Sequence, residues 1–369
     1  MKAVAVHTYM GGMQLGVSKV TEVITSLESW EDAMEARELA ALTYDDVPRY
    51  DSLKDWTGSA DFVFANPPCA RFSVSAARTY SSVKKADLGE FCELQDVCGI
   101  TQQSGAKMMW WETGPMLWTK GRDMVYSIHE YMARWWGSCT TLVVKVDARS
   151  FGVPQKRPRC HAIHCAGDFV PIIDPRETPW PLEDSAFKWL AKQMRSRWDY
   201  RFSPSDAKDE FLQAKPNDCW GDPVKYCRVQ DVICTFGQGK PQIFSINDPY
   251  LPVVLSGRLA CWEELNRWIS IEEWAAFMTM PPRYARAIAE ELGAHKTLQL
   301  LSKGVCSDVS QRVAEQFAIP MTSMTGTLEL EESHRWKDGV WGWDASVKDS
   351  RKRKFGQGRQ GRGRGQALP

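Results

Sequence analysis

The sequence predicts an α/β fold: a largely parallel sheet with helices on both faces, and a small irregular or β-rich domain beside it. Short β-rich runs alternate with helical stretches from the N-terminus to about Cys165, as in strand–helix–strand units. From Gly167 to Cys261 the chain becomes rich in proline, tryptophan and charge, with little periodicity. A length of 369 residues suits one large domain and a smaller one.

The alternation places the elements of the large domain in order. We expect strands at Ala3–Val6, Glu22–Leu27, Asp61–Ala65, Lys107–Trp111 and Thr140–Val146. We expect helices after the Gly11–Gly12 pair and at Glu31–Leu42, Leu88–Ser104 and Arg122–Trp136. Helical periodicity returns at Ile271–Phe277 and continues through Val309–Phe317.

These changes divide the chain into four parts. Residues 1–166 and 264–320 form the main domain, and residues 167–263 form the small domain between them. The pattern fades beyond Pro320, so we expect residues 321–369 to be a linker and a disordered tail, basic from Arg351 to Lys354 and beyond.

Composition and charge exclude several classes of protein. The formal net charge of zero argues against a uniformly basic nucleic-acid coat, although local basic patches remain open. Eleven cysteines without a CxxC pair favour reduced thiols and make a structural zinc site a weak expectation. No segment has the apolar length of a membrane span, and the N-terminus resembles a first strand rather than a signal peptide. We therefore expect a cytoplasmic protein without a metal ion.

A cysteine on a proline-rich loop is the first candidate functional residue. The apolar run Asp61–Ala65 predicts a buried strand, and Pro67 and Pro68 follow it directly before Cys69. Ligands bind beyond the carboxyl ends of strands in open α/β sheets, so Cys69 is a candidate nucleophile. Taken alone, it is more often a small buried cysteine in a turn.

A glutamate and two arginines could act on the same substrate. Glu112 ends an apolar strand after two tryptophans, whose bulk would desolvate it and raise its pKa, which suits proton sharing with a heterocycle nitrogen. Arg157 and Arg159 stand two apart on an extended segment, so both point the same way. They could hold a base carbonyl, the glutamate and a phosphate. A basic surface loop is the alternative for the arginines.

Three further positions suit a cofactor. The Gly11–Gly12 pair follows the first strand and allows close backbone approach, although a tight turn explains it equally well. Glu28 ends the second strand, where an acidic side chain commonly holds ribose hydroxyls. Asp46 could bind an adenine amino group. The alternatives are a solvated carboxylate for Glu28 and a turn for Asp46.

Together these motifs resemble those of the DNA cytosine-5 methyltransferase family, in the family's order. Glycine, cysteine, glutamate and arginine motifs all contribute: Gly11–Gly12, Pro68–Cys69 with Phe72–Ser73, Glu112 with Leu117 and Gly121, and Gly152–Gln155 with Arg157 and Arg159. A later helix motif is similar at Arg267, Ser270, Glu273 and Met280–Pro281. The resemblance covers nearly the whole catalytic core and allows a divergent, phage-like member.

The resemblance implies a class I S-adenosylmethionine-dependent methyltransferase fold, Rossmann-like, with a target-recognition domain at residues 167–263. It implies a monomeric enzyme that methylates carbon 5 of cytosine in double-stranded DNA. Cys69 would add to carbon 6 of a flipped-out base, helped by Glu112, Arg157 and Arg159. The implied cofactor-binding residues are Gly11, Gly12, Glu28, Asp46, Pro67 and Lys303. The implied DNA-binding residues are Arg71, Ser73, Arg78, Lys84 and Gln155.

The chain departs from the family at four places. Tyr9 stands at a glycine of the cofactor loop, and Ala70 follows the cysteine where the family has glutamine. Thr113–Gly114 replaces Asn-Val after the glutamate. Aligning the later valines places Ser302–Lys303 where the last motif has Gly-Asn.

Lys303 bears on the methyl donor. A lysine ammonium beside a sulfonium cation would repel it unless an anion is present. Carboxy-S-adenosylmethionine would supply that anion, so a carboxymethyl group is an alternative to methyl. There are two alternatives. Lys303 could point to solvent, or the motif could be shifted so that Gly304 stands at the family glycine; in either case no anion would be needed beside the donor.

Three other interpretations stay open. The run Asn66–Pro68 also resembles exocyclic-amine methyltransferases, which follow the prolines with an aromatic residue rather than cysteine. A catalytically silent DNA-binding relative is the second. The basic tail would add salt-sensitive affinity for phosphates or simply aid solubility. The DNA target sequence, a restriction partner and a self-protection role cannot be read from the sequence, although divergence and size favour a bacteriophage or mobile-element origin.

Overall fold

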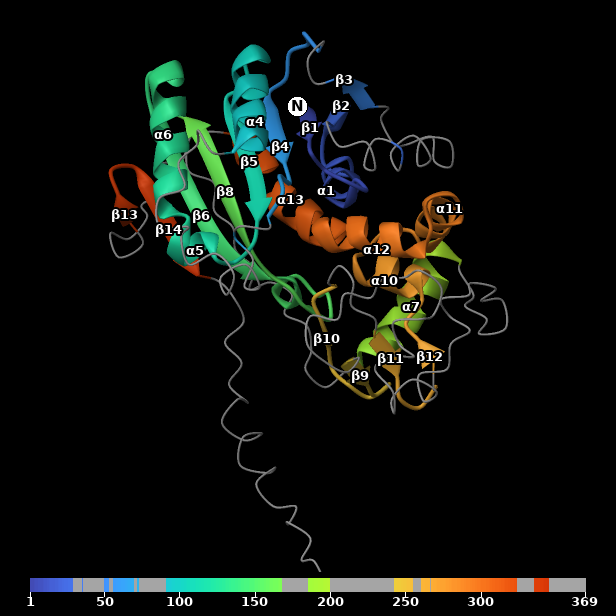
Figure 1. The fold of residues 1–369 in the computed structure, drawn as a ribbon. Helices are drawn as coiled ribbons and strands as arrows, with labels where there is room; N and C mark the ends of the chain where they lie inside the picture. The colour runs from blue at the N-terminus through green and yellow to red at the C-terminus, as the bar shows by residue number, and fades with distance from the viewer. Residues whose placement is uncertain are drawn as a thin grey trace, which may run out of the picture.

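The computed structural model describes residues 1–28, 35, 50–52, 56–69, 72, 91–167, 185–199, 242–254, 260–265, 267–323 and 335–344. Within these residues a nine-stranded sheet has the order β13-β14-β6-β8-β5-β4-β1-β2-β3 (Figure 1). Its strands are β1 (Lys2–Val6), β2 (Glu22–Glu28), β3 (Tyr50–Ser52), β4 (Phe62–Ala65), β5 (Met108–Thr113), β6 (Cys139–Asp147), β8 (Pro158–Ala166), β13 (Arg335–Lys337) and β14 (Val340–Asp344). The predicted α/β fold is confirmed.

Strand direction brings the loop after β4, the end of β5 and the start of β8 to one edge of the sheet. β3, β2, β1, β4 and β5 run parallel to one another, whereas β8 is antiparallel to both β5 and β6. The first residues of β8 therefore lie beside the carboxyl end of β5, whose other neighbour is β4. We call this side the carboxyl edge; it carries the loop after β4 and the end of β5.

Helices cover both faces of the sheet, as predicted. The covering helices are α1 (Gly12–Val17), α4 (Cys92–Gln103), α5 (Leu117–Lys120), α6 (Arg122–Trp136), α10 (Ile271–Phe277), α11 (Pro282–Leu292), α12 (Ala294–Lys303) and α13 (Ser307–Ser323). Alternation along β5 produces the two cores. Met108 and Trp110 belong to the core cluster that includes residues of α1 and α10 to α13, and Met109 and Trp111 belong to the cluster that includes residues of α4, α5 and α6.

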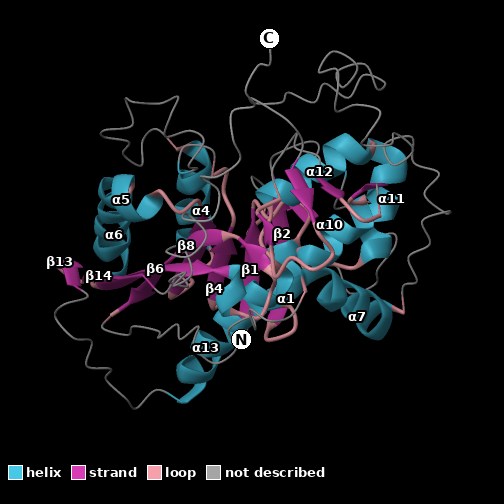
Figure 2. Cartoon of the chain, turned by 90° about the horizontal axis from the view of Figure 1, so that it is seen from below, coloured by secondary structure: helices cyan, strands magenta, loops and turns pink. Residues whose placement is uncertain are grey.

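The described part of residues 167–263 differs from the irregular or β-rich domain that we expected. It contains a helix, α7 (Ala186–Trp198), besides β9 (Gln242–Phe244), β10 (Leu251–Pro252) and β11 (Ala260–Trp262). Leu190 and Met194 of α7 are buried in the same cluster as Phe277 of α10. Figure 2 shows α7 on the same side of the molecule as α10, which it contacts. This helix was not predicted because its few buried apolar residues stand among many charged ones.

Three short elements complete the description of the fold. They are η3 (Ala148–Ser150), β7 (Gln155–Lys156) and β12 (Arg267–Trp268). β7 pairs with β10, and β11 pairs with β9 and β12. The helix expected at Glu31–Leu42 lies outside the described residues except for Glu35.

The expectation of a linker and a disordered tail from residue 321 is wrong for two segments. α13 continues to Ser323, and β13 and β14 form a hairpin that joins the sheet at β6. Asp338 and Gly339 at its turn have φ angles of 38° and 82°. An Asp-Gly pair between β-formers is a hairpin signal, because both central residues of such a turn need positive φ. Residues 345–369 lie outside the described part.

No helix in the described ranges has both the length and the apolar character needed to cross a membrane.

Candidate active site

Cys69 lies on the loop that leaves the carboxyl edge after β4. Pro67 is buried and Cys69 is half-buried, and the carbonyl of Cys69 accepts a hydrogen bond from Phe72 N at 2.9 Å. Burial raises the pKa of the Cys69 thiol, and Glu112 adds to this, whereas Arg159 and Arg157 act in the opposite direction. The thiol is therefore protonated at neutral pH until a neighbouring group activates it.

Glu112 is the carboxyl group beside this cysteine. It lies near the end of β5, is 0% exposed, and accepts a hydrogen bond from Asn66 Nδ2 at 2.6 Å. Its second oxygen lies 3.0 Å from Arg159 Nε. Burial raises the pKa of Glu112 to about 7, although the two arginines oppose the shift. The predicted desolvated carboxyl group is thus present, poised between its protonated and ionised forms.

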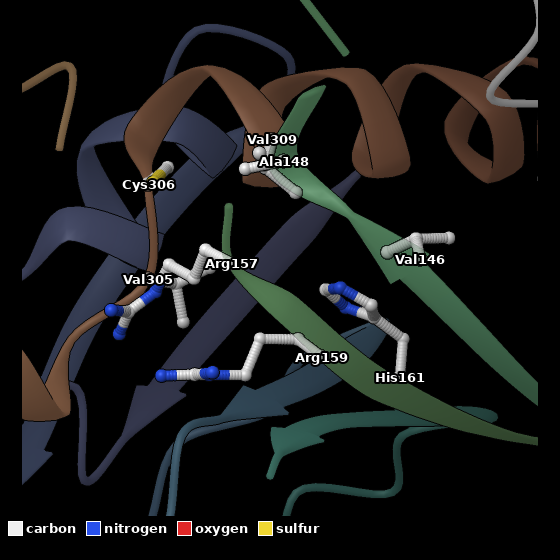
Figure 3. Close-up of a pocket in the computed structure, with 8 residues that line it drawn as sticks. All are labelled: Val146, Ala148, Arg157, Arg159, His161, Val305, Cys306 and Val309. Atoms are coloured by element: carbon white, nitrogen blue, oxygen red, sulfur yellow. The ribbon is translucent and has the colours of Figure 1, made fainter. Parts of the chain in front are cut away.

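Arg157 and Arg159 extend in the same direction from the start of β8, as the spacing predicted (Figure 3). Their partners differ. Arg159 pairs with Glu112, whereas Arg157 donates to the carbonyls of Ser302, at 3.0 Å, and Gly304. Arg157 is 2% exposed. It therefore holds the backbone on both sides of Lys303.

A small cavity separates the arginines from the start of α13. Figure 3 shows the side chains that line it: Val146, Ala148, Arg157, Arg159, His161, Val305, Cys306 and Val309. Trp110 Nε1 donates to His161 Nδ1 at 3.1 Å, and burial lowers the pKa of His161 to about 3, so this imidazole is neutral. The two guanidinium groups are the only cations on this wall of the described structure.

The cofactor loop follows β1 and differs in detail from the expectation. Gly11 has a φ of 79°, and a Cβ at Gly12 would lie 2.3 Å from the carbonyl oxygen of Val305. The close approach predicted at Gly12 is therefore to the chain's own backbone. Tyr9, at the place of the family glycine, keeps a positive φ of 51° despite its side chain.

Glu28 lies at the end of β2, as predicted, and is 3% exposed. Its carboxylate accepts from Tyr9 N at 3.3 Å and contacts His7 Nδ1 at 3.1 Å. The other ring nitrogen of His7 lies 3.5 Å from Asp96 on α4. Neither His7 nor Asp96 was predicted as a site residue, because only the glycine positions of this loop carry a recognisable motif.

Lys303 is the last residue of α12, and its ammonium lies 5.6 Å from the centre of the Tyr9 ring. This is within the range of a cation–π contact. The side chain therefore points toward the cofactor loop.

Gln155 does not fit the expected DNA contact. It is 0% exposed, and its amide nitrogen lies 3.5 Å from the carbonyl oxygen of Phe277. A fully buried side chain cannot reach DNA, so Gln155 instead supports β7 against α10. The other predicted cofactor and DNA residues lie outside the described residues: Asp46, Arg71, Ser73, Arg78 and Lys84.

Asn66 is a further site residue without a predicted role. Its amide orients Glu112. Its place directly after the predicted strand and before the two prolines could have marked it as a site residue. An amide that donates to one carboxylate oxygen leaves the other for Arg159, so the two partners together fix the plane of the carboxyl group.

The chain is similar to a known protein family over most of its length. A family model described as C-5 cytosine-specific DNA methylase matches residues 1–318. No curated protein matched the chain.

Solved structures similar to the chain include three methyltransferases. A putative DNA modification methyltransferase encoded within an E. coli prophage has 12% identity and a TM-score of 0.57, over 87% of this chain and 99% of that one. The Entamoeba histolytica methyltransferase EhMeth has 11% identity and a TM-score of 0.57, over 87% and 98%. A mutant DNMT2 of Spodoptera frugiperda has 12% identity and a TM-score of 0.54, over 85% and 99%. At these identities the likeness shows a shared fold.

Proposed function

Because this chain belongs to the C-5 cytosine-specific DNA methylases, we propose that Cys69, Glu112 and Arg159 together catalyse its reaction. The chain is a DNA cytosine methyltransferase. One observation carries the assignment of residues: Glu112 is buried near the Cys69 loop and held by Asn66 on one oxygen and Arg159 on the other. A group held in this way is ready for proton transfer without further rearrangement.

The chemistry requires these groups because carbon 5 of cytosine is a poor nucleophile. The Cys69 thiolate forms a bond to carbon 6 while Glu112 gives its proton to N3, which leaves an enamine with electron density on carbon 5. Carbon 5 would then accept the methyl group that S-adenosylmethionine supplies when bound, with the electron pair of the broken C–S bond staying on the donor sulfur. Loss of the carbon 5 proton to a base and release of the Cys69 thiolate restore the aromatic ring, and N3 returns its proton to Glu112. Arg159 stabilises the O2 side of the adduct.

The pKa values support these roles. A carboxyl group with a pKa of about 7 supplies a proton at neutral pH and recovers it afterwards. Arg157 acts as a positioning residue, because its guanidinium binds backbone carbonyls rather than the carboxyl group. The target cytosine must leave the base stack, since neither face of its ring is accessible inside a duplex.

The residues around the cofactor loop fit S-adenosylmethionine, the donor of this family. When bound, it supplies an electrophilic methyl carbon. Glu28, a buried carboxylate at the end of β2, is of the residue type and position that suit its ribose hydroxyls. Within the described residues, Thr8 Oγ1 and Asn66 Oδ1 are buried without hydrogen-bond partners and lie after β1 and β4. Gly11 and Pro67 belong to the same two loops, and Asp46 remains a prediction.

Trapping on 5-fluorocytosine DNA tests the nucleophile. Fluorine at carbon 5 blocks the final elimination, so an active enzyme stays covalently attached to DNA in the presence of donor. We expect a denaturation-resistant adduct with the wild type and with Cys92→Ser, a matched change of an exposed cysteine on α4. Cys69→Ser should give none. An adduct that survives Cys69→Ser would refute the assignment, and no adduct with any protein would favour a silent DNA-binding relative.

A second candidate is carboxymethyl transfer from carboxy-S-adenosylmethionine. The observation that favours it is the position of Lys303, whose ammonium lies 5.6 Å from the centre of the Tyr9 ring, beside the cofactor loop. A donor carboxylate would offset this cation. Mass spectrometry of nucleosides after incubation with each donor distinguishes the two reactions. Lys303→Asn should abolish the carboxymethyl product, and Lys192→Asn, a change of an exposed lysine on α7, should not. Methylcytosine alone, unaffected by Lys303→Asn, would refute this candidate.

A further inference from the structure

The small cavity between the two arginines and α13 has a polar wall that the proposed mechanism does not use. Arg157 and His161 both line this cavity (Figure 3). Alternate residues of an extended segment face the same side, so Arg157, Arg159 and His161 form one row along the start of β8. His161 is 0% exposed and Arg157 is 2% exposed, so both belong to the interior of the protein.

Both side chains keep hydrogen-bond donors without a partner among the described residues. His161 Nδ1 accepts from Trp110 Nε1 at 3.1 Å, so the proton of this neutral ring is assigned to Nε2. His161 Nε2, Arg157 Nε and Arg157 Nη1 are buried, and no described residue accepts from them. Buried polar groups are nearly always hydrogen-bonded, so these donors point to an acceptor inside the cavity.

Arg157 also lacks a counter-charge within the described structure. Its guanidinium donates to two backbone carbonyls, which carry no net charge. The carboxylates that belong to neighbouring elements have other partners: Glu112 pairs with Arg159, and Asp308 of α13 pairs with Arg197. A buried charge is costly unless an opposite charge lies beside it. The acceptor that this cavity favours is therefore an anion.

The size and the remaining walls of the cavity fit a single small ion. Its volume is about 10 Å³, close to the least that holds one water molecule. A water molecule would need acceptors for its own hydrogens, and the lining side chains offer only the sulfur of Cys306, a weak one. The helix α13 begins directly after Cys306, so the positive end of its dipole lies at the cavity. The other lining side chains are apolar: Val146, Ala148, Val305 and Val309.

We propose that this cavity binds one monatomic anion, a halide such as chloride, between Arg157 and His161. The anion accepts hydrogen bonds from the donors of both side chains and balances the buried guanidinium charge. It thereby helps to hold Arg157 against the backbone on both sides of Lys303. The anion binds without DNA or donor, so the proposal stands or fails independently of the proposed function.

Anomalous X-ray scattering from bromide locates the anion directly. Crystals of the full chain are grown without halide and soaked in sodium bromide. We expect a bromine peak within hydrogen-bond distance of His161 Nε2 and of the Arg157 guanidinium. Bromide peaks at other positions only, or an ordered water molecule in the cavity with no bromine peak, would overturn the proposal.

Thermal unfolding tests the same site in solution. Sodium chloride is compared with sodium gluconate at equal ionic strength, because gluconate is too large for the cavity. A ligand that binds only the folded protein raises the unfolding midpoint in a saturable way, here by about 2 °C at ten times its dissociation constant. Equal midpoints in the two salts at every concentration would overturn the proposal.

Variants of the cavity separate this site from a general effect of salt. Val309→Ile adds a methyl group to the cavity wall and should abolish the difference between chloride and gluconate. Val20→Ile, the same change at a half-buried residue in the turn after α1, should retain it. His161→Gln can still accept from Trp110 and donate to the anion, so it should retain the difference, whereas His161→Phe should lose it. A chloride effect that is equal in Val309→Ile, His161→Phe and the wild type would refute the site.

Discussion

His7 Nδ1 lies 3.1 Å from Glu28 Oε1, and its Nε2 lies 3.5 Å from Asp96 Oδ2. One imidazole thus connects the loop after β1 with the end of β2 and with α4. Burial by itself would lower the pKa of His7, but hydrogen bonds to Asp96 and Glu28 outweigh it and raise the pKa to about 9. At neutral pH His7 is therefore a buried cation that balances the buried Glu28 carboxylate.

The first prediction concerns stability against pH. The folded pKa of His7 is raised, so its stabilisation is fully present below pH 6.5 and is lost as pH rises through about 9. A shift of this size corresponds to at most about 3 kcal/mol. Between pH 6.5 and 9.5 the free energy of unfolding should therefore fall less in His7→Gln than in the wild type. Urea denaturation at each pH measures this difference. His295→Gln on α12 is the control and should follow the wild-type curve. A His7→Gln curve parallel to the wild type would contradict the pairing.

The second prediction concerns the pH dependence of kcat/KM. In the mechanism that we propose, the active form has a protonated Glu112, with a pKa of about 7, and an ionised Cys69, whose pKa is raised. Below pH 7, kcat/KM should rise about tenfold per pH unit, because the thiolate fraction of Cys69 rises by that factor. Above pH 7 it should level off, because the protonated fraction of Glu112 falls as fast as the thiolate fraction rises. Glu112→Gln should lower kcat/KM by about 10² to 10⁴ and remove the break near pH 7. A break that persists in Glu112→Gln would assign it to another group.

The third prediction separates the two arginines. Arg157→Met leaves the carbonyls of Ser302 and Gly304 without their donor, so it should reduce the unfolding free energy by about 2–4 kcal/mol. Arg159→Met removes a partner of Glu112 from a partly open position. It should cost less stability than Arg157→Met but lower the single-turnover rate by about 10² or more. Urea denaturation and rapid-quench methylation measure the two effects. Equal losses in both assays for both variants would mean that the arginines act as one unit.

Much of the architecture could be predicted because it depends on periodicity. The strand at Ala3–Val6 differs from β1 by one residue, and the helix at Arg122–Trp136 has the bounds of α6. Cys69 and Glu112 lie at the same edge of the sheet because Cys69 follows β4 and Glu112 lies near the end of the parallel strand β5. These conclusions needed only local pattern and a general rule of topology.

Side-chain partners could not be predicted, since they depend on packing between distant segments. Arg157 and Arg159 look equivalent in sequence, yet one binds backbone carbonyls and the other the carboxyl group. Gln155 matched a motif but is buried against α10, which begins more than a hundred residues later. The hairpin is a different case, since Asp338–Gly339 was a readable local signal that was overlooked.

The last prediction contrasts two glycines that backbone geometry alone does not distinguish. A Cβ at Gly12 would lie 2.3 Å from the Val305 carbonyl oxygen, a contact that backbone must move to relieve, so Gly12→Ala should destabilise the protein by about 1–3 kcal/mol. Gly99 lies within α4 with nothing within 4 Å of the same position, so Gly99→Ala should stabilise it by about 0.5–1 kcal/mol through helix propensity. Gly12→Ala should also weaken donor binding, because the displaced backbone belongs to the loop beside Lys303, whereas Gly99→Ala should leave it unchanged. Thermal unfolding and calorimetric titration with S-adenosylmethionine measure both effects, and a stable Gly12→Ala with unaltered binding would contradict the close approach of α1 and α13.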